Sequence, residues 1–299
     1  MILYYAVGGG LGHVSRSLAI IHTLIIPSDE IIILSSIKNV AKIFKTTRYK
    51  HIPVHDKFDK KPDEYEAWLK NILDNYAIKQ VFLDAFPFGI KYEWENIALF
   101  CPQIKFTYIA RLLNKETVNQ IITRQKICYT QTFICEKIEN QQHLSFINNH
   151  SEIVSNLELS YPVNKKISLT YKRLFLKIKK DDNKLYLIVH SGSENEIEML
   201  LDYANEISVV KKEIPFFILI SPLVHLVKLP EHCLGFSYYP ASTFFEMADR
   251  IFTACGFNSM QQTLLYTEKH HFLPFPRKLD DQFQRANLRR KMKEQKVSY

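Results

Sequence analysis

Residues 2–19 read ILYYAVGGGLGHVSRSLA, and this stretch decides the fold class. The apolar run Ile2–Val7 predicts a buried strand, and the apolar spacing of Val14–Ile25 predicts a helix. Between them lie four of the chain's eight glycines, all within residues 8–12. A strand, a glycine loop and a helix in this order predict the first βα unit of a doubly wound α/β fold.

The same alternation continues along the chain and restarts in its second half. Strands are predicted at Glu30–Leu34, Gln80–Leu83 and Lys105–Ile109, then at Leu185–Val189, Phe216–Ile220, Ile251–Thr253 and His271–Phe275. Further helices are predicted at Asn39–Lys45, Glu64–Asn75 and Tyr92–Leu99, then at Glu194–Ile207, Thr243–Met247, Ser259–Tyr266 and from 282 to about 293. Continuously apolar strands fit parallel sheets covered on both faces. We therefore predict two α/β domains, residues 1–163 and 164–299, with a cleft between them.

Composition narrows the class of protein. The chain has 299 residues, of which 46% are apolar and 23% charged, and this balance excludes wholesale disorder, collagen-like repeats and coiled coil. No run of about 18 apolar residues occurs, and the N-terminus does not resemble a secretory signal, so a cytoplasmic location is expected. Five scattered cysteines without a C-x-x-C pair argue against a disulfide framework and a zinc site.

The formal net charge is +8, and two basic clusters contribute much of it. One spans residues 165–180 and the other residues 285–296. Each is explained by a solvated helix face, and the alternative is peripheral contact with an anionic membrane. Zinc, RNA-recognition and helix-turn-helix signatures are all missing, so no nucleic-acid partner is expected.

The glycine loop favours ligand binding over a simple turn. Glycines let the backbone approach a ligand, and the helix start after them offers unpaired N–H groups to an anion. The dinucleotide fingerprint fails because His13 occupies its third glycine position, and the phosphate-loop motif is absent. A neutral His13 could accept a proton from a hydroxyl, whereas its cation could face a phosphate. The structural alternative is a helix-start histidine bonded to backbone.

The pattern Gly8–Ala19 resembles the N-terminal loop of GT-B glycosyltransferases, in particular the lipid-linked N-acetylglucosaminyltransferases of peptidoglycan synthesis (family 28-like) and poorly characterised relatives. Further matches follow in order at Leu83–Gly89, Tyr161–Asn164, Val189–Ser193, Ala254–Met260 and Pro276–Ala286. The resemblance covers nearly the whole chain. It implies two Rossmann-like domains facing across a cleft, the N-terminal one on the acceptor side and the C-terminal one binding the nucleotide-sugar donor.

The resemblance also implies site residues. The first loop would contribute Gly9, Gly10 and Gly12 to the acceptor and diphosphate sites. Donor-binding residues are implied at Ser191, Gly192, Ser193, Gly256, Asn258, Ser259, Gln262, Arg277, Asp281 and Gln282. The loop residues would meet phosphate, Arg277 would neutralise it, and Asp281 with Gln282 would bond sugar hydroxyls. Two features depart from the family: Gln262 (or Gln261) replaces a ribose-binding glutamate, and Glu194 and Glu196, at a helix start, would repel a diphosphate.

Sugar transfer needs a base for the acceptor hydroxyl, and His13 is the predicted base. Asp84 is either a rival base or the partner that orients His13, because it ends an apolar strand at the edge where α/β sheets bind ligands. A turn or helix-capping role is the alternative for Asp84. The chain has no Asp-x-Asp element, so no metal or other cofactor is expected.

The sequence therefore predicts a glycosyltransferase of the hexosyl type. The predicted reaction moves a sugar, with inversion, from a UDP-linked donor to a saccharide or lipid-linked acceptor of cell-envelope polysaccharide synthesis. Two alternatives stay open. One is a catalytically inactive sugar-nucleotide-binding or scaffold protein of the same fold, and the other is a sugar-nucleotide epimerase, whose additional acid set the sequence does not reveal.

Overall fold

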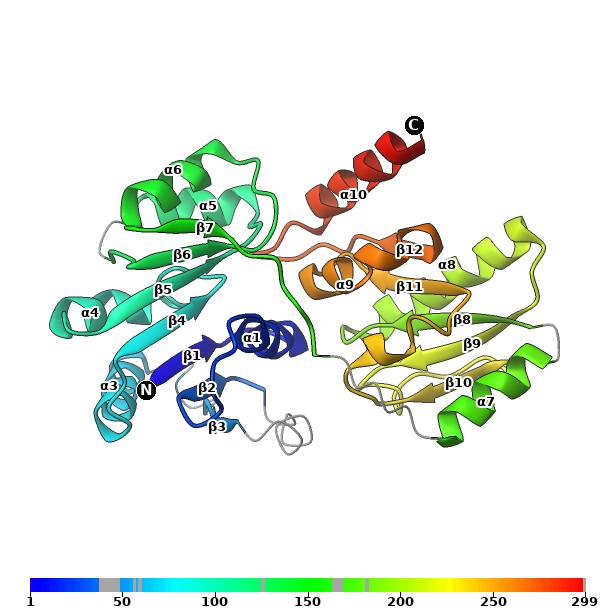
Figure 1. Ribbon diagram of the computed structural model, residues 1–299, viewed down its shortest axis with the longest axis horizontal. Helices are drawn as coiled ribbons and strands as arrows, with labels where there is room; N and C mark the ends of the chain where they lie inside the picture. The colour runs from blue at the N-terminus through cyan, green and yellow to red at the C-terminus, as the bar shows by residue number, and fades with distance from the viewer. Residues whose placement is uncertain are drawn as a thin grey trace. The chain divides into compact units, whose positions relative to one another are not determined.

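The computed structural model describes residues 1–37, 49–55, 58, 61–124, 127–162, 169–180 and 183–297. The chain divides into two compact units, one of Met1–Tyr161 with Lys278–Asp280 and the other of Pro162–Arg277 with Asp281–Tyr299. Each unit is built on its own parallel sheet (Figure 1). The predicted boundary after Val163 and the predicted helix Asn39–Lys45 lie outside the described residues.

The first unit contains a seven-stranded sheet in the order β3-β2-β1-β4-β5-β6-β7, and every neighbouring pair is parallel. Its strands are β1 (Ile2–Ala6), β2 (Ile31–Ser35), β3 (Lys50–Pro53), β4 (Gln80–Asp84), β5 (Lys105–Ala110), β6 (Gln131–Ile134) and β7 (Val154–Asn156). The strand order reverses between β1 and β4. In open α/β sheets, ligands bind at such a switch point, outside the carboxyl ends of the strands.

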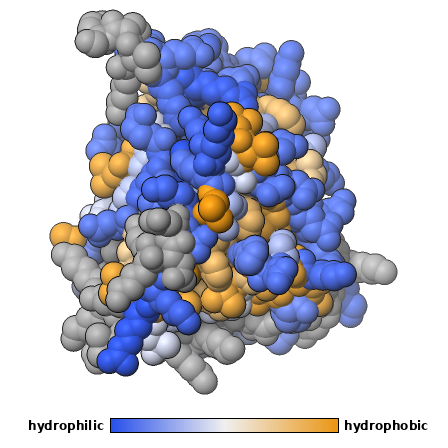
Figure 2. Space-filling model, turned by 90° about the vertical axis from the view of Figure 1, so that its right-hand side faces the viewer, coloured by the Kyte–Doolittle hydropathy of each residue, from blue (hydrophilic) through white to orange (hydrophobic). Residues whose placement is uncertain are grey.

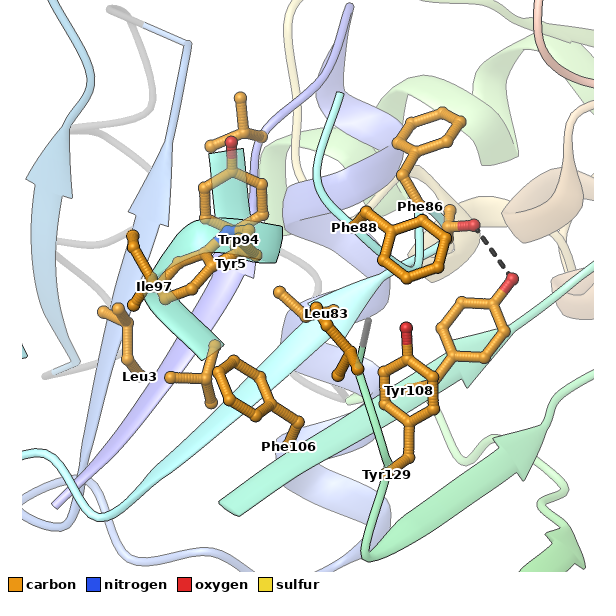
Figure 3. Close-up of a cluster of buried hydrophobic side chains, with 14 of the residues drawn as sticks. Leu3, Tyr5, Leu83, Phe86, Phe88, Trp94, Ile97, Phe106, Tyr108 and Tyr129 are labelled. Carbon is orange, nitrogen blue, oxygen red and sulfur yellow. Dashed lines mark hydrogen bonds between the residues drawn. The ribbon is translucent and has the colours of Figure 1, made fainter. Parts of the chain in front are cut away.

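The helices of the first unit are α1 (Leu11–Thr23), α3 (Pro62–Asn75), α4 (Glu93–Phe100), α5 (Lys115–Ile122) and α6 (Gln141–His150). Alternate residues of the central strands point to opposite faces of the sheet, so each strand is apolar throughout. Figure 3 shows one face of this core, where Leu3 and Tyr5 of β1 meet Trp94 of α4 and Phe106 of β5. Tight packing of these rings fixes the carboxyl ends of β1 and β4.

The second unit contains a five-stranded parallel sheet in the order β10-β9-β8-β11-β12. Its strands are β8 (Lys184–Val189), β9 (Pro215–Ile220), β10 (Cys233–Phe236), β11 (Arg250–Ala254) and β12 (His270–Leu273). Its helices are α7 (Leu169–Lys180), α8 (Glu194–Lys211), α9 (Phe257–Gln262) and α10 (Gln282–Val297), with 3-10 turns at Ala241–Phe244 and Leu264–Lys269. Tyr186 and Ile188 of β8 pack towards α8, whereas Leu185 and Leu187 pack towards α7.

The structure confirms the predicted doubly wound α/β class and all the predicted strands, with boundaries that differ by a few residues. Two predicted helices are wrong in type or extent. Thr243–Met247 coincides with a 3-10 turn, and Ser259–Tyr266 is divided between α9 and a second 3-10 turn. Short strands such as β7 were not predicted, because three or four residues carry little periodicity. The amphipathic helix α7 was not predicted either, because its many lysines obscure the pattern of its buried residues Phe175 and Ile178.

Near its end the chain returns to the first unit for three residues. Nη1 of Arg111, after β5, donates to Oδ1 of Asp280 at 2.5 Å, and Nδ2 of Asn114 donates to the carbonyl of Lys278 at 2.5 Å. The backbone N–H of Asn114 also donates to the carbonyl of Leu279 at 3.2 Å. Lys278–Asp280 is therefore a strap on the first unit, although the predicted boundary assigned it to the second domain.

Hydrophilic side chains cover most of the face drawn in Figure 2, and hydrophobic ones gather near its centre. Of the helices that the structure describes, none is both long enough and apolar enough to cross a membrane. All five cysteines are free in the structure.

Candidate active site

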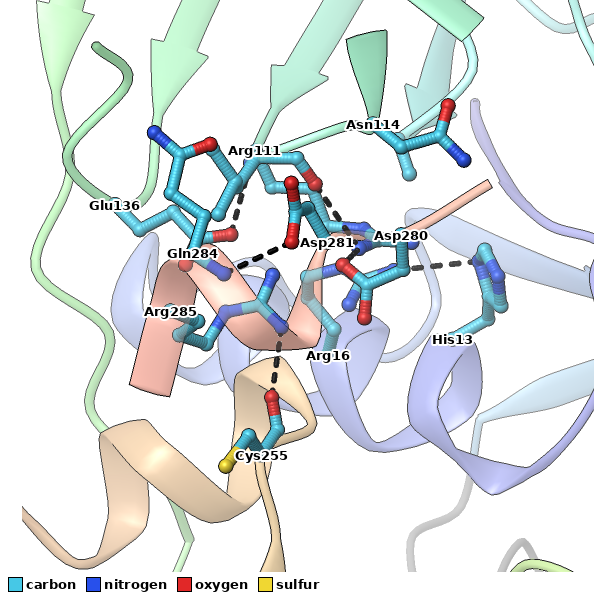
Figure 4. Close-up of polar contacts among 12 residues, drawn as sticks. His13, Arg16, Arg111, Asn114, Glu136, Cys255, Asp280, Asp281, Gln284 and Arg285 are labelled. Atoms are coloured by element: carbon cyan, nitrogen blue, oxygen red, sulfur yellow. Dashed lines mark hydrogen bonds and ion pairs between the residues drawn. The ribbon is translucent and has the colours of Figure 1, made fainter. Parts of the chain in front are cut away.

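The carboxyl ends of β1 and β4 bring His13, Arg16 and Asp84 together. Asp84 is the last residue of β4. His13 and Arg16 lie one turn apart on α1, as Figure 4 shows. The Oδ2 atom of Asp84 lies 2.6 Å from Nδ1 of His13. Arg16 donates from Nε to Oδ1 at 2.5 Å and from Nη2 to Oδ2 at 2.7 Å. All three side chains are buried, with His13 the most exposed at 7%. This geometry matches the predicted alternative in which Asp84 orients His13, although their roles in a reaction stay predictions.

The charges of this cluster fix the tautomer of His13. Burial raises the pKa of Asp84, but Arg16 and His13 outweigh it and hold the carboxyl ionised, well below its usual range. An ionised carboxylate only accepts hydrogen bonds, so Nδ1 of His13 carries the hydrogen and its 3.3 Å approach to Arg16 is no hydrogen bond. Burial lowers the pKa of His13 more than Asp84 raises it. The imidazole is therefore neutral at pH 7, and Nε2 is its proton acceptor.

Gly8 leaves the space that this imidazole fills. A Cβ atom on Gly8 would lie 2.2 Å from Nε2 of His13, far inside any real contact. Ser36, after β2, holds the same residue, because its hydroxyl donates to the Gly8 carbonyl at 2.6 Å and accepts from the Gly8 N–H at 3.2 Å. Gly10 has a φ of 102°, which only glycine adopts readily. Of the predicted loop residues, Gly9 has open space at its Cβ position and Gly12 lies in the first turn of α1.

Gly8→Ala is expected to displace the imidazole of His13 and to destabilise the first unit by about 1–3 kcal/mol, the usual cost of overpacking. Both tryptophans of the chain, Trp68 and Trp94, lie in the first unit, so denaturant unfolding followed by tryptophan emission reports on this unit. Gly9→Ala is the matched control and should change the free energy of unfolding by less than about 1 kcal/mol. Equal losses in the two variants would contradict this account of the loop.

A second buried carboxyl, Glu93, lies where α4 begins. The Tyr5 hydroxyl donates to its Oε1, the Lys91 N–H donates to its Oε2 at 2.7 Å, and the hydroxyls of Tyr5 and Tyr65 are 3.0 Å apart. Burial raises the pKa of Glu93 to about 7, and backbone hydrogen bonds from Glu93, Lys91 and Ile90 only partly oppose it. The folded protein therefore keeps a proton on Glu93 that an unfolded chain has already lost above about pH 5.

This difference sets the sign of a pH effect on stability. Between about pH 5 and pH 7 the folded state binds more protons at Glu93 than the unfolded state, so stability falls as pH rises. Relative to Glu93→Gln, the wild type is expected to lose about 2.5 kcal/mol of unfolding free energy between pH 5 and pH 8, because the pKa of Glu93 is about 7 in the folded state. Parallel pH profiles for the wild type, Glu93→Gln and the exposed control Glu116→Gln would refute the assignment.

In the second unit, the predicted loop Ser191–Ser193 is bordered by an ion-pair cluster. Glu196, in the first turn of α8, accepts from both terminal nitrogens of Arg277 at 2.5 and 2.7 Å. Its Oε2 also lies 2.7 Å from Nε2 of His190, and a Cβ on Gly192 would touch both side chains. Burial lowers the pKa of His190, so the neutral imidazole donates its Nε2 hydrogen to Glu196. Arg277 is thus engaged with a carboxylate, and its predicted contact with phosphate stays a prediction.

The other predicted donor residues lie at two helix starts of the second unit. Gly256 precedes α9, which contains Asn258, Ser259 and Gln262. Asp281 Oδ1 accepts from the Gln284 N–H at 2.8 Å and caps α10 (Figure 4). Gln282 is buried, and its Oε1 accepts from the Phe275 N–H at 3.1 Å. The side chains of Asp281 and Gln282 therefore stabilise the fold at these atoms, and their predicted contact with sugar hydroxyls is untested.

The C-terminal basic cluster is partly internal. Arg285 and Arg289 are buried, and Arg285 Nη1 donates to the Cys255 carbonyl at 2.8 Å (Figure 4). Arg289 donates to the Met260 carbonyl, and Lys293 Nζ donates to the His270 carbonyl at 3.0 Å. These bonds satisfy carbonyls near the ends of α9, β11 and β12, which leaves fewer cations of this cluster for a membrane surface than the sequence indicated.

Sequence reasoning gave no role to Arg16 or His190, and it treated Glu196 only as a helix-start carboxylate that would repel a diphosphate. The i, i+3 spacing of His13 and Arg16 on one helix face was the available signal for the first. For Glu196, the signal was the S-x-x-E pattern after Ser193, whose hydroxyl does accept from the Glu196 N–H at 3.4 Å. Within the described ranges, no group of three or more His, Cys, Asp or Glu side chains is placed to hold a metal ion.

No family model and no curated protein matches this sequence. Solved structures, in contrast, are similar to the structure of this chain. The glycosyltransferase SsfS6 of Streptomyces sp. SF2575, in complex with thymidine diphosphate, aligns with 92% of this chain and 82% of its own at 12% identity, with a TM-score of 0.58. The chain has the GT-B fold. The chain is also similar to the forosaminyltransferase SpnP, at 12% identity over 96% of this chain and 82% of that one, with a TM-score of 0.60. A further similar structure is S. aureus MnaA with UDP, at 10% identity over 94% of this chain and 80% of that one, with a TM-score of 0.61. At such identities, the GT-B likeness shows the fold alone.

Proposed function

We propose that this GT-B protein is a glycosyltransferase that moves a sugar from a nucleotide-sugar donor, UDP-linked, to an acceptor hydroxyl. The observation that carries the proposal is the buried cluster of His13, Asp84 and Arg16 at the switch point of the first sheet. Its neutral imidazole, fixed through Nδ1, offers Nε2 as a general base. Asp84 stabilises the imidazolium that forms when a proton arrives, and Arg16 keeps Asp84 ionised.

In the proposed reaction, the acceptor oxygen bonds to the anomeric carbon while the bond from that carbon to the nucleotide diphosphate breaks. The hydroxyl proton passes to Nε2 of His13 and from there to water. Attack opposite the leaving group inverts the anomeric carbon. Backbone N–H groups and hydroxyls of residues 191–193 and 256–259 would stabilise the departing diphosphate without a metal ion. Peptidoglycan-type chemistry, the predicted saccharide or lipid-linked acceptor and the domain roles across a cleft stay predictions.

The experiment is release of nucleoside diphosphate from a panel of nucleotide sugars, first chosen by thermal shift, with and without added alcohols. A ligand at about 100 times its dissociation constant stabilises by roughly 2.7 kcal/mol and is readily detected. Acceptor-dependent release with an inverted product anomer supports the transferase. Binding of a nucleotide sugar without any release supports the inactive binding or scaffold protein instead.

One observation favours a second candidate, a sugar-nucleotide epimerase. The His190–Glu196–Arg277 cluster supplies an acid–base group in the second unit, which the sequence had not revealed. A UDP-GlcNAc 2-epimerase of Methanocaldococcus jannaschii also shares the fold, at 12% identity over 92% of this chain and 89% of its own, with a TM-score of 0.55. Nucleotide release or C2 inversion without any acceptor would favour this candidate over the transferase.

A cytoplasmic location with peripheral contact at an anionic membrane is the remaining part of the proposal. Its support is the exposed share of the basic residues, such as Lys291 on α10 and Arg173 on α7. Equal binding to neutral and anionic vesicles at low salt would remove the membrane contact from the proposal.

A further inference from the structure

An open pocket of about 280 Å³ lies in the first unit, where β1, β2 and β3 end. Its volume is near the lower end of small-molecule sites and suits one or two fused rings. Its walls are largely apolar and include Val7, Val54, Phe58 and Ile90. The Phe58 ring stacks on Tyr65 at a centroid distance of 5.1 Å, with 25° between the planes. Such walls favour a flat apolar ligand.

Three of the polar side chains that line the pocket, those of Tyr5, Tyr65 and Glu93, are already bonded. The hydroxyls of Tyr5 and Tyr65 form one pair, and the Glu93 carboxyl accepts from Tyr5 and from the Lys91 N–H. A saccharide would bring several hydroxyls against the apolar part of the wall, and each hydroxyl left there without a partner costs about 1–3 kcal/mol. A compound with a single hydroxyl avoids that cost and buries its rings against the apolar wall.

One wall of the pocket belongs to the candidate active site. Gly8 and Gly9 line the pocket, and the imidazole of His13 fills the space beside Gly8. A hydroxyl held at this wall would therefore lie next to Gly8, the residue beside which the imidazole of His13 packs. Among the polar clusters of the residues that the structure describes, only the one around Glu93 combines a cavity, aromatic walls and contact with the glycine loop.

We infer that this pocket binds the rings of a planar apolar alcohol of the phenol class, with its hydroxyl at the wall formed by Gly8 and Gly9. That the bound hydroxyl is the one glycosylated rests on the proposed function. The binding itself rests on the pocket alone, so the two claims fail separately.

Both tryptophans of the chain report on this pocket. Trp94 meets the Tyr5 ring at 5.3 Å, and Trp68 lies 5.0 Å from the Phe58 ring (Figure 3 shows the first pair). The probe is tetrahydro-2-naphthol, a phenol fused to a saturated ring, and the saccharide control is methyl glucoside. Equilibrium dialysis measures binding, and tryptophan emission shows whether the probe lies beside these walls. We expect saturable binding of the phenol with a change in emission, at least about tenfold tighter than any binding of methyl glucoside.

Two variants fill the pocket and should each weaken phenol binding at least tenfold. Val54→Phe enlarges a wall residue, and Gly9→Leu adds a side chain where nothing lies within 4 Å of the Cβ position. Val209→Phe, at an exposed valine of α8, is the matched control and should bind like the wild type. Thermal melts show whether either filling variant is misfolded. If one is, phenol binding by the other filling variant tests the inference.

The inference is overturned if the folded wild type does not bind the phenol, if methyl glucoside binds as tightly, or if neither filling variant weakens binding. A protein that binds the phenol but no nucleotide sugar would overturn the proposed function and leave the pocket assignment standing. A protein that transfers sugar to alcohols of other classes but not to the phenol would overturn the pocket assignment and leave the transferase standing.

Discussion

Asp84→Ala is expected to lower the free energy of unfolding of the first unit by about 3–5 kcal/mol, the cost of leaving one partner of a buried ion pair behind. Arg16 is 2% exposed and donates two hydrogen bonds to Asp84, so the substitution removes the carboxylate that balances a buried guanidinium. Denaturant unfolding followed by tryptophan emission is the measurement. Asp74→Ala, at an exposed position of α3, is the control and should cost less than about 1 kcal/mol.

The pH dependence of this loss has a fixed sign. Arg16 and His13 depress the pKa of Asp84 in the folded state, so its contribution is complete above the ordinary carboxyl pKa of about 4 and declines below it. The difference between wild type and Asp84→Ala should therefore shrink as pH falls below 4. The double variant Arg16→Met with Asp84→Ala should recover part of the loss, because no charge is left unpaired. Additive losses in the double variant would show that the pair is not coupled.

His13→Gln is expected to reduce sugar transfer by about 10²–10⁴-fold, the usual contribution of a general base. Glutamine keeps a polar group near Asp84 but cannot take a proton, so stability should change much less than turnover. Initial rates of acceptor-dependent nucleotide release measure the effect. His22→Gln, on the exposed side of the same helix, is the matched control and should keep wild-type turnover.

The pH profile separates a base from a merely structural histidine. Burial lowers the pKa of His13 below 6.5, and the base form is the one required, so turnover should fall only as pH drops through that lowered value. His13→Gln should lose this acidic limb as well as its rate. Turnover within twofold of the wild type in His13→Gln would mean that another group takes the proton.

Much of the fold followed from local patterns. Apolar strands of β1, β4 and β8 are buried on both faces of a sheet, so their sequences carry a signal that needs no partner to be recognised. The edge strand β7 lacked this signal, because it has only three residues, two of them exposed, and pairs with β6 by backbone bonds that side chains do not encode. The strap at Lys278–Asp280 could not be predicted from local patterns either, because the contacting residues Arg111 and Asp280 lie 169 positions apart in the sequence.

The candidate site was predicted only where sequence and topology agree. His13 follows the glycine loop and Asp84 ends a strand, so the rule for sheet switch points placed both on one edge. The tautomer of His13 could not be predicted, because it depends on Arg16 keeping Asp84 ionised in a buried space. The engagement of Arg277 by Glu196 was likewise unpredictable, as a long side chain at a loop has many possible partners and only the packed structure selects one.

Nitrogen NMR of the His13 ring tests the central claim most directly, with resonances of the histidine-labelled wild type assigned by their loss in His13→Gln. The account predicts a neutral ring at pH 7 with its hydrogen on Nδ1, and an unprotonated Nε2 that titrates below pH 6.5. A ring with its hydrogen on Nε2, or an imidazolium at pH 7, would contradict the account, because Nε2 would then have no lone pair to accept the proton of an acceptor hydroxyl.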